Sequence, residues 1–191
     1  MKFSFRNRKN VEYFVKESVL KSGKVKFSVS KNSNDGLERL PEGYEFFENI
    51  SGQVFIRKIK VCKIDKHEVS IVRGEIKKNK KAKYAVVFVD GDEITVYEPF
   101  ENIDAMAECA FRGDRRKSLD EYKQYYSSNA RYMPFFKFIL IDENKRLFQA
   151  ERFCFRGSVD SWISLNIPKT IEILAKEYCP HFLQDSFYDL V

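Results

Sequence analysis

The chain has 191 residues, of which 43% are hydrophobic and 15% aromatic, and this composition excludes an intrinsically disordered protein. Lysine and arginine number 34 against 28 aspartates and glutamates, so the net charge is +6, which favours anionic partners without requiring them. Four isolated cysteines, two histidines and the lack of a phosphate-binding glycine loop argue against a disulfide framework, a zinc knuckle and the common nucleotide-binding motifs.

The N-terminal segment argues against secretion. Residues 1–10 alternate Lys and Arg with Phe and contain no apolar run of the length that a signal peptide needs. No stretch of the sequence has the length and apolarity of a membrane span. We therefore expect a cytoplasmic protein with reduced cysteines and no membrane partner.

The first predicted elements are short. Val11, Phe14, Val15 and Val19 have helical spacing, which predicts an amphipathic helix over residues 11–20. Alternating apolar residues predict a strand over 24–30, and the polar run at 31–36 predicts a loop.

A hairpin and a helix follow. Residues 43–49 and 53–61 are rich in aromatic and β-branched residues and flank a turn at 50–52, which predicts a β-hairpin. Asp65 and Glu68 have the spacing of a capping box, and the apolar spacing after them predicts a helix ending near Asn79.

The middle of the chain predicts a second hairpin and two helices. The strands over 83–89 and 92–98 flank Asp90-Gly91, a pair suited to a tight turn. Asn102 can cap one helix, and Ser118 with Glu121 forms a capping box for another.

A third hairpin is predicted between Phe135 and Phe155, with residues 142–145 as its connection. Six phenylalanines would give this hairpin apolar residues on both faces, so we expect it to be buried on both sides at the centre of the sheet.

Helices are predicted for the rest of the chain. Ser158 can cap a helix over the segment that contains Trp162, and Pro168 can lie in the first turn of a second helix, which ends at Pro180. A last amphipathic piece runs from His181 to Leu190.

Together these elements predict one α+β domain over residues 1–191. We expect an antiparallel sheet of six or seven strands, built from three hairpins and an early strand, with five to seven helices mostly on one face.

Two clusters of basic residues are candidates for contact with phosphate. The alternative for each is a solvated surface, since lysines at the end of a helix also interact favourably with its dipole. The clusters are Lys77, Lys78, Lys80, Lys81 and Lys83, and Arg115, Arg116 and Lys117 with the neighbouring Arg112.

Other groupings of reactive side chains have structural explanations. Two groups suggest a metal-dependent nuclease, namely Asp90, Asp92 and Glu93, and Asp142 and Glu143 with Lys145. Both groups fall in predicted turns, where such residues are common. Cys179 and His181 lie close in sequence, yet neither a catalytic pair nor a zinc site can be completed locally, and we expect each cysteine to be a small buried residue. We therefore expect no metal site and no cofactor.

The strings LPEGYEFFENISGQVFIRK, at 40–58, and FCFRGSVDSWI, at 153–163, resemble segments of an uncharacterised family of prokaryotic proteins. This resemblance implies no activity, cofactor or partner. It directs attention to polar and aromatic residues that core packing does not easily explain. These candidate binding residues are Tyr44, Glu45, Gln53, Arg57, Arg156, Asp160 and Trp162.

Two functions remain open from sequence alone. The first is a non-enzymatic interaction module that binds nucleic acid, or another anionic or protein partner, through a basic surface; self-association is a further alternative. The second is an enzyme of unrecognised type, with a pocket near Glu45, Arg156 and Asp160 lined by Tyr44 and Trp162.

Overall fold

The computed structural model describes residues 2–156, 159–165 and 167–190. The chain divides into two compact units. Unit 1 comprises Met1–Ile59 and Ile103–Arg131, and unit 2 comprises Lys60–Asn102 and Tyr132–Val191. The described residues form ten strands in three antiparallel sheets of three, two and five strands. The α+β class and the antiparallel pairing are therefore confirmed, whereas the expected single sheet of six or seven strands is wrong.

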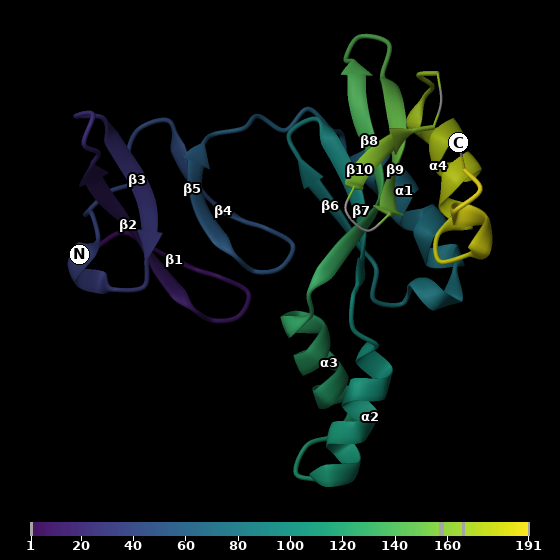
Figure 1. Cartoon of the computed structure of the whole chain (residues 1–191), viewed down its shortest axis with the longest axis horizontal. Coiled ribbons are helices and arrows are strands. Elements are labelled where there is room, and N and C mark those ends of the chain that lie inside the picture. Colours follow the sequence, from purple (N-terminus) through teal and green to yellow (C-terminus); the bar gives the residue numbers. More distant parts are fainter. Residues whose placement is uncertain (1, 157–158, 166, 191) are drawn as a thin grey trace. The chain divides into compact units, whose positions relative to one another are not determined.

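Unit 1 begins with a three-stranded sheet in the order β1-β2-β3, formed by β1 (Ser4–Arg6), β2 (Glu12–Val19) and β3 (Val25–Ser30) (Figure 1). The predicted strand at 24–30 is confirmed, and the helix predicted over 11–20 is wrong. Phe14 and Val15 are both buried although they are adjacent, because they point to opposite faces of β2. The spacing of so short an apolar run is compatible with a helix or with a strand. Here hydrogen bonding with β1 and β3 makes the segment a strand.

The first predicted hairpin is confirmed as β4 (Tyr44–Glu48) and β5 (Val54–Lys58). Two of its aromatic side chains, Tyr44 and Phe46, pack on one face of the three-stranded sheet. The Phe46 ring stacks 5.2 Å from that of Phe5, and the Tyr44 ring meets Phe27 edge-on at 5.1 Å. That face of the sheet is therefore apolar, whereas the opposite face carries the buried Phe14 beside polar and charged residues.

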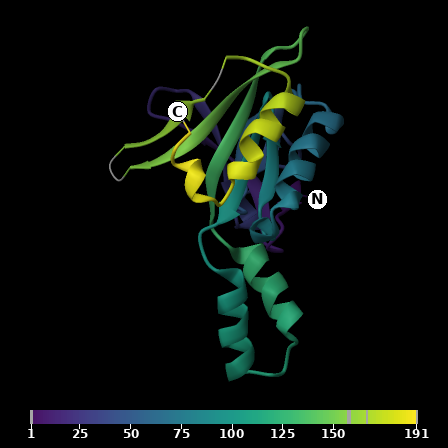
Figure 2. The ribbon, with the colours of Figure 1, turned by 90° about the vertical axis from the view of Figure 1, so that its right-hand side faces the viewer.

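Unit 1 also contains a helical hairpin, whose two helices lie side by side in Figures 1 and 2. As predicted, α2 (Ile103–Gly113) is followed by α3 (Leu119–Asn129), which begins at the capping box of Ser118 and Glu121. Ile103 and Ala107 are the buried residues of α2. Burial of these two residues, and not helix propensity alone, stabilises so short a helix.

Unit 2 is built on a five-stranded sheet in which each strand pairs with the next along the chain, in the order β10-β9-β8-β7-β6. In chain order the strands are β6 (Val86–Asp90), β7 (Glu93–Pro99), β8 (Tyr132–Asp142), β9 (Leu147–Arg156) and β10 (Val159–Ser164). The second and third predicted hairpins are thus confirmed. Asp90 pairs with Glu93, so the tight turn is Gly91-Asp92 and not Asp90-Gly91.

Helices α1 (Lys66–Lys78) and α4 (Ile171–Tyr178) cover one face of this sheet (Figure 2). The capping box of Asp65 and Glu68 is present at the start of α1, as predicted. The largest fully buried side chains of this core come from β7, β8, β9, the helices and the C-terminal turns. They are Phe136, Phe138, Phe148, Phe182, Phe187, Ile94, Ile171, Leu174, Val72 and Val96.

The prediction that the third hairpin is buried on both faces is wrong. Strand β8 is central, and its Phe136 and Phe138 are fully buried under the helices, but the alternate residues Lys137 and Ile139, on the other face, are only partly buried. Phe135 lies where the β7–β8 register shifts and its ring is 5.0 Å from Phe182, so it joins the same core. Among the described residues α1 and α4 cover one face of this sheet, whereas α2 and α3 belong to unit 1, so the expectation that most helices lie on one face of the sheet holds for two of the four.

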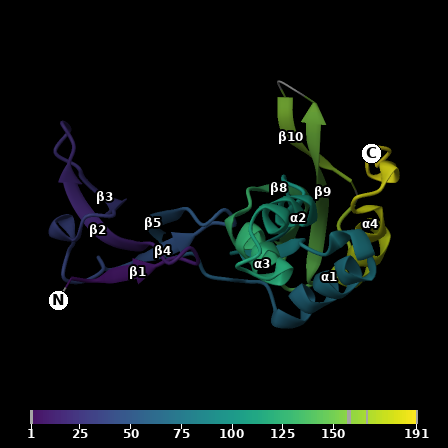
Figure 3. The ribbon, with the colours of Figure 1, turned by 90° about the horizontal axis from the view of Figure 1, so that it is seen from below.

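The C-terminal predictions are partly wrong. The segment expected to be a helix after Ser158 is strand β10, which runs beside β9 (Figure 3) and in which Trp162 pairs with Phe153; Ser158 itself lies outside the described residues. Helix α4 begins at Ile171, after the backbone of Lys169 has paired with Phe148. The described part of the chain has four α-helices, and its last residues form short 3₁₀ turns, η3 (Cys179–His181) and η4 (Asp185–Phe187).

The described core cluster lies wholly in unit 2. The division into units does not test cooperative unfolding, and the single domain over residues 1–191 stays a prediction. No helix among the described residues is long and apolar enough to cross a lipid bilayer.

Candidate anion-binding surface

The positive charge of the chain is unevenly divided between the two units. Unit 1 holds eighteen Lys and Arg against twelve Asp and Glu, whereas unit 2 holds sixteen of each. The whole net charge of +6 therefore belongs to unit 1. A surface that attracts anions is accordingly expected there.

Within unit 1 the excess is greatest in the three-stranded sheet. Residues 1–31 contain nine Lys and Arg but only Glu12 and Glu17 as acids. Residues 18–34, which include the β2–β3 turn and all of β3, contain four lysines and no acid. Such a segment has a positive field that nearby carboxylates do not cancel.

The strand register places three of these basic residues on one face of the sheet. Arg6 pairs with Glu12, Lys16 with Ser28, and Lys26 with Ser18, and all three positions lie on the face opposite Phe5 and Phe27. We call Arg6, Lys16 and Lys26 the basic face.

The basic face is accessible and only weakly neutralised. The Arg6 side chain is 59% exposed and its Nη2 lies 3.9 Å from Glu12, while Lys16 Nζ lies 3.3 Å from Asp35. Lys26 is exposed and makes no ion pair with a described residue. Exposed pairs of this kind contribute about 1 kcal/mol or less, so the lysine and arginine can exchange them for another anion.

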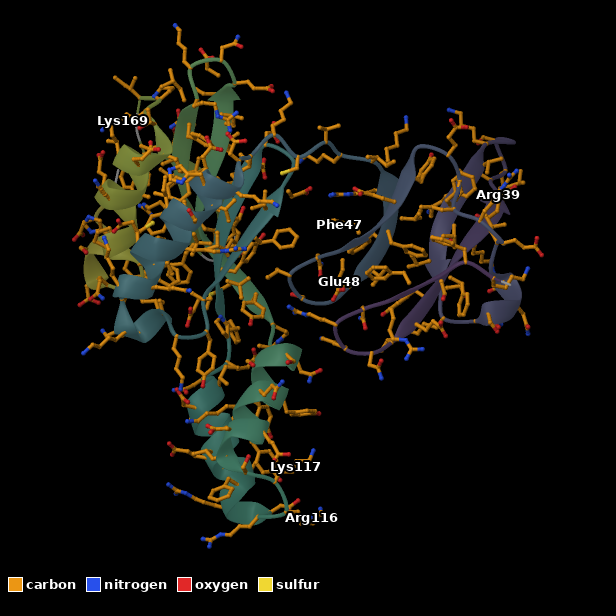
Figure 4. All side chains as sticks on the ribbon, turned by 180° about the vertical axis from the view of Figure 1, so that it is seen from behind. Arg39, Phe47, Glu48, Arg116, Lys117 and Lys169 are labelled. Atoms are coloured by element: carbon orange, nitrogen blue, oxygen red, sulfur yellow. The ribbon has the colours of Figure 1, made fainter. Side chains whose placement is uncertain are left out.

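The predicted cluster at Arg115, Arg116 and Lys117 lies in the loop between α2 and α3, where Arg116 and Lys117 are labelled in Figure 4. All three side chains are exposed. Arg116 Nη2 lies 2.8 Å from Asp114 Oδ2, and the hydrogen bonds from Arg116 hold the pKa of Asp114 below its usual value. This cluster belongs to the basic unit, but one of its charges is already paired.

The predicted lysine cluster lies in unit 2, at the C-terminal end of α1 and in the adjoining 3₁₀ turn η2 (Lys80–Ala82). Lys78 Nζ lies 2.7 Å from Glu75. The position of this cluster fits the favourable interaction of cations with a helix C-terminus. Unit 2 carries no net charge, so the lysines of this cluster are not part of a larger basic surface. The exposed members of the cluster include Lys77, Lys80, Lys81 and Lys83.

Four of the seven candidate binding residues lie in the β4–β5 hairpin of unit 1. Arg57 Nε donates to Glu45 Oε1 at 2.9 Å, and the Arg57 guanidinium lies 3.6 Å from the centre of the Phe47 ring. Gln53 accepts a hydrogen bond from Asn49 at 2.8 Å, and Tyr44 packs on Phe27. These residues therefore have structural roles within the hairpin.

The other three candidates, Arg156, Asp160 and Trp162, lie in β9 and β10 of unit 2. Asp160 is exposed, and the side chain of Arg156 lies outside the described residues. Trp162 packs edge-on against Phe153, with ring centres 5.2 Å apart. The candidates thus fall into two units, and the pocket expected near Glu45, Arg156 and Asp160 stays a prediction.

Sequence reasoning missed an ion pair on the uncovered face of the five-stranded sheet. Lys137 Nζ lies 3.0 Å from Glu151 and 4.5 Å from the Trp162 ring, and both charged side chains are less than one fifth exposed. The lone lysine in the run Phe-Phe-Lys-Phe-Ile was the available signal, because alternation places it opposite the buried phenylalanines.

Cys179 is an unsuitable nucleophile. Its side chain is buried, and burial raises the pKa of its thiol to about 12, so the thiol is protonated near neutral pH. Cys154 is also buried, whereas Cys62 and Cys109 are exposed, which corrects the expectation that every cysteine is a small buried residue. No group of three or more potential metal ligands occurs among the residues that the structure describes.

Unit 1 has two pockets of note. One, of about 480 Å³, is lined by residues that include Arg8, Lys9, Lys117 and Glu121. The other, of about 330 Å³, is lined by Glu17, Phe27, the segment 37–39 and Pro41. Neither contains any of the seven candidate binding residues. Neither is lined by a histidine or a cysteine, so neither offers an imidazole base or a thiol nucleophile.

No protein-family model, no curated protein and no solved structure matches the chain. The resemblance of residues 40–58 and 153–163 to an uncharacterised prokaryotic family therefore stays a prediction, and functional inference depends on the surface alone.

Proposed function

We propose that this protein is a non-enzymatic, cytoplasmic nucleic-acid-binding module that contacts the phosphate backbone through unit 1. The observation that carries the proposal is the segregation of charge, because unit 1 holds the whole excess of +6. Four free cysteines are consistent with a reducing compartment.

An extended polyanion fits this surface better than a small anion. The basic residues of the first 31 positions are spread over three strands and their turns, and the two pockets of unit 1 gather only Arg8 and Lys9 of them. DNA presents one negative charge per roughly 1.7 Å of duplex, so it can meet separated cations at the same time. Arg6, Lys16 and Lys26 share one face and are the first contacts that we assign.

Salt dependence tests the proposal directly. The full chain is titrated into a fluorescein-labelled DNA duplex of mixed sequence and into its single strand, and anisotropy is followed from about 50 to about 200 mM salt. We expect affinity to fall steeply with salt, because each neutralised phosphate releases counterions. A flat salt response, or no binding to either probe, would refute the proposed function.

A matched pair of triple variants locates the surface. In the first, Arg6, Lys16 and Lys26 are replaced by Gln, and we expect the slope of log K against log salt to lose about three units of magnitude on duplex DNA. In the second, Lys77, Lys80 and Lys81 of unit 2 are replaced by Gln, which removes the same charge. The second variant should bind like the unmodified protein, and a greater loss there would move the site to unit 2.

A further inference from the structure

The β2–β3 hairpin ends in a two-stranded ribbon. Strand β1 pairs only with the first three residues of β2, Glu12–Phe14, so from Lys16 to Val19 the sheet partner of β2 is β3 alone. Val19 and Val25 form the last cross-strand pair, and the loop continues the ribbon beyond them (Figure 3). We call residues 19–26 the hairpin tip.

The turn of the hairpin tip has a defined geometry. The Leu20 N–H donates to the Lys24 carbonyl at 2.9 Å, and the Gly23 N–H donates to the Leu20 carbonyl at 2.8 Å. Gly23 has a φ of +78°, as the last residue of a three-residue hairpin loop requires. The side chains at the tip are therefore presented by an ordered ribbon.

The tip combines exposed aliphatic side chains with uncancelled positive charge. Val19 is 69% exposed, Val25 52% and Leu20 46%. Lys21, Lys24 and Lys26 are exposed beside them, and the nearest acids in sequence are Glu17 and Asp35. A single exposed valine needs no explanation, but three aliphatic residues at the end of one ribbon indicate a contact surface.

We propose that the hairpin tip enters a groove of double-stranded nucleic acid. The major groove of B-form DNA is about 12 Å wide and admits a two-stranded β-ribbon. In this arrangement the lysines reach phosphates on either side of the groove, while Val19 and Val25 contact apolar base edges such as the thymine methyl group. The inference rests on the proposed function and adds the contacting element and the form of the ligand.

The distribution of charge favours a duplex over an anionic membrane as the partner. A membrane would engage the tip alone, but the positive charge continues away from the tip along β2 and β1 to Lys16 and Arg6. Val19 and Val25 lie on the face of the ribbon opposite Lys16 and Lys26, so a duplex meets both sets where the ribbon is inserted between the two walls of its groove. Binding to anionic vesicles is therefore an outcome that would overturn the inference.

The test replaces both exposed valines by threonine, which keeps the shape and the strand preference of the side chain. Because Val19 and Val25 are mostly exposed, thermal unfolding of Val19→Thr/Val25→Thr should match that of the unmodified chain. We expect its affinity for the labelled duplex to fall about tenfold, since two apolar contacts are lost, while the salt slope stays the same. The control is Val61→Thr in unit 2, a valine that is 73% exposed, and it should bind normally.

The outcomes separate this inference from the proposed function. If no nucleic acid binds, both fail. If the duplex binds with a steep salt dependence but the double variant binds equally well, only the assignment of the hairpin tip is wrong. That assignment is also wrong if the single strand binds as tightly as the duplex and shows the same loss. Sedimentation of the protein with phosphatidylcholine vesicles containing one quarter phosphatidylserine, abolished in the double variant, would instead assign the tip to a lipid surface.

Discussion

Glu98 is the residue whose ionisation most clearly depends on the fold. It lies in β7, and its Oε2 atom is buried and accepts no hydrogen bond from any described residue. Burial raises the pKa of this carboxyl from 4.5 to about 7. The folded protein therefore binds the proton of Glu98 more tightly than the unfolded chain does.

The consequence for stability has a definite sign. The contribution of protonated Glu98 is fully present below pH 4.5 and is lost as pH rises through about 7, where the ionised carboxylate becomes a cost of folding. Glu98→Gln should raise the free energy of unfolding at pH 8 by about 1 kcal/mol, a value reduced for the partial exposure of the side chain.

Urea unfolding of both proteins at pH 4, 6 and 8 measures this difference. At pH 4 the substitution should change little, because the carboxyl is protonated in both states. An equal effect at every pH would show that Glu98 does not titrate in the expected range.

Single residues also show where sequence reasoning reaches its limit. The charges of Glu45 and Arg57 attracted attention in the sequence, and the structure pairs them across one hairpin at 2.9 Å. Glu68 was predicted only as a capping residue, yet its carboxylate also binds Arg146, whose Nη2 lies 2.5 Å away although 78 residues separate the two in sequence. The capping role is local and was predictable, whereas the second partner depends on the folded sheet.

At the scale of elements, two glycines provide a matched pair of substitutions. Gly91 begins the β6–β7 turn with a φ of +67°, and a Cβ atom there would collide with the side chain of Lys60. Gly74 lies within α1, where a Cβ atom would meet no heavy atom within 4 Å. The two positions have opposite requirements, because only the turn needs a left-handed backbone.

We expect Gly91→Ala to lower the free energy of unfolding by about 1–2 kcal/mol, through backbone strain and displacement of the Lys60 side chain. Gly74→Ala should raise it by roughly 0.5–1 kcal/mol, because alanine favours the helix. Denaturant titration of both variants measures the changes. Stabilisation by Gly91→Ala would contradict the assigned turn geometry.

The elements that were predicted correctly are marked by short sequence patterns at their own ends. Capping boxes mark the starts of α1 and α3, and turn residues join the strands of the predicted hairpins. The two helices predicted wrongly, at 11–20 and after Ser158, are short segments that pair with the neighbouring strands of the chain, and their own apolar spacing does not reveal this pairing. Phe14 and Trp162 became strand residues because β3 and β9 offered hydrogen bonds to their backbones.

At the scale of the whole molecule, the division into two units has a measurable consequence. The described core cluster belongs to unit 2, and Trp162, the single tryptophan, lies there as well. Its fluorescence therefore reports on unit 2, while far-ultraviolet circular dichroism reports on the strands and helices of both units.

We expect the two signals to give different unfolding midpoints in urea, because unit 1 lacks residues in that core cluster. Coincident transitions would establish one cooperative domain over residues 1–191, as predicted from the sequence. The triple variant of the basic face serves as a control, since its changes lie outside unit 2 and should leave the tryptophan transition in place.

The sequence by itself determined the antiparallel α+β class, three of the hairpins, the two helices that begin at capping boxes and the excess of positive charge, because each of these follows from local spacing or from composition. Only the tertiary structure decided that the strands form three sheets, that one face of the large sheet lacks helices among the described residues, and that unit 1 holds the whole net charge. The physical reason is that strand pairing and burial join residues that are far apart in the chain, and no local pattern records which distant partner a strand will meet.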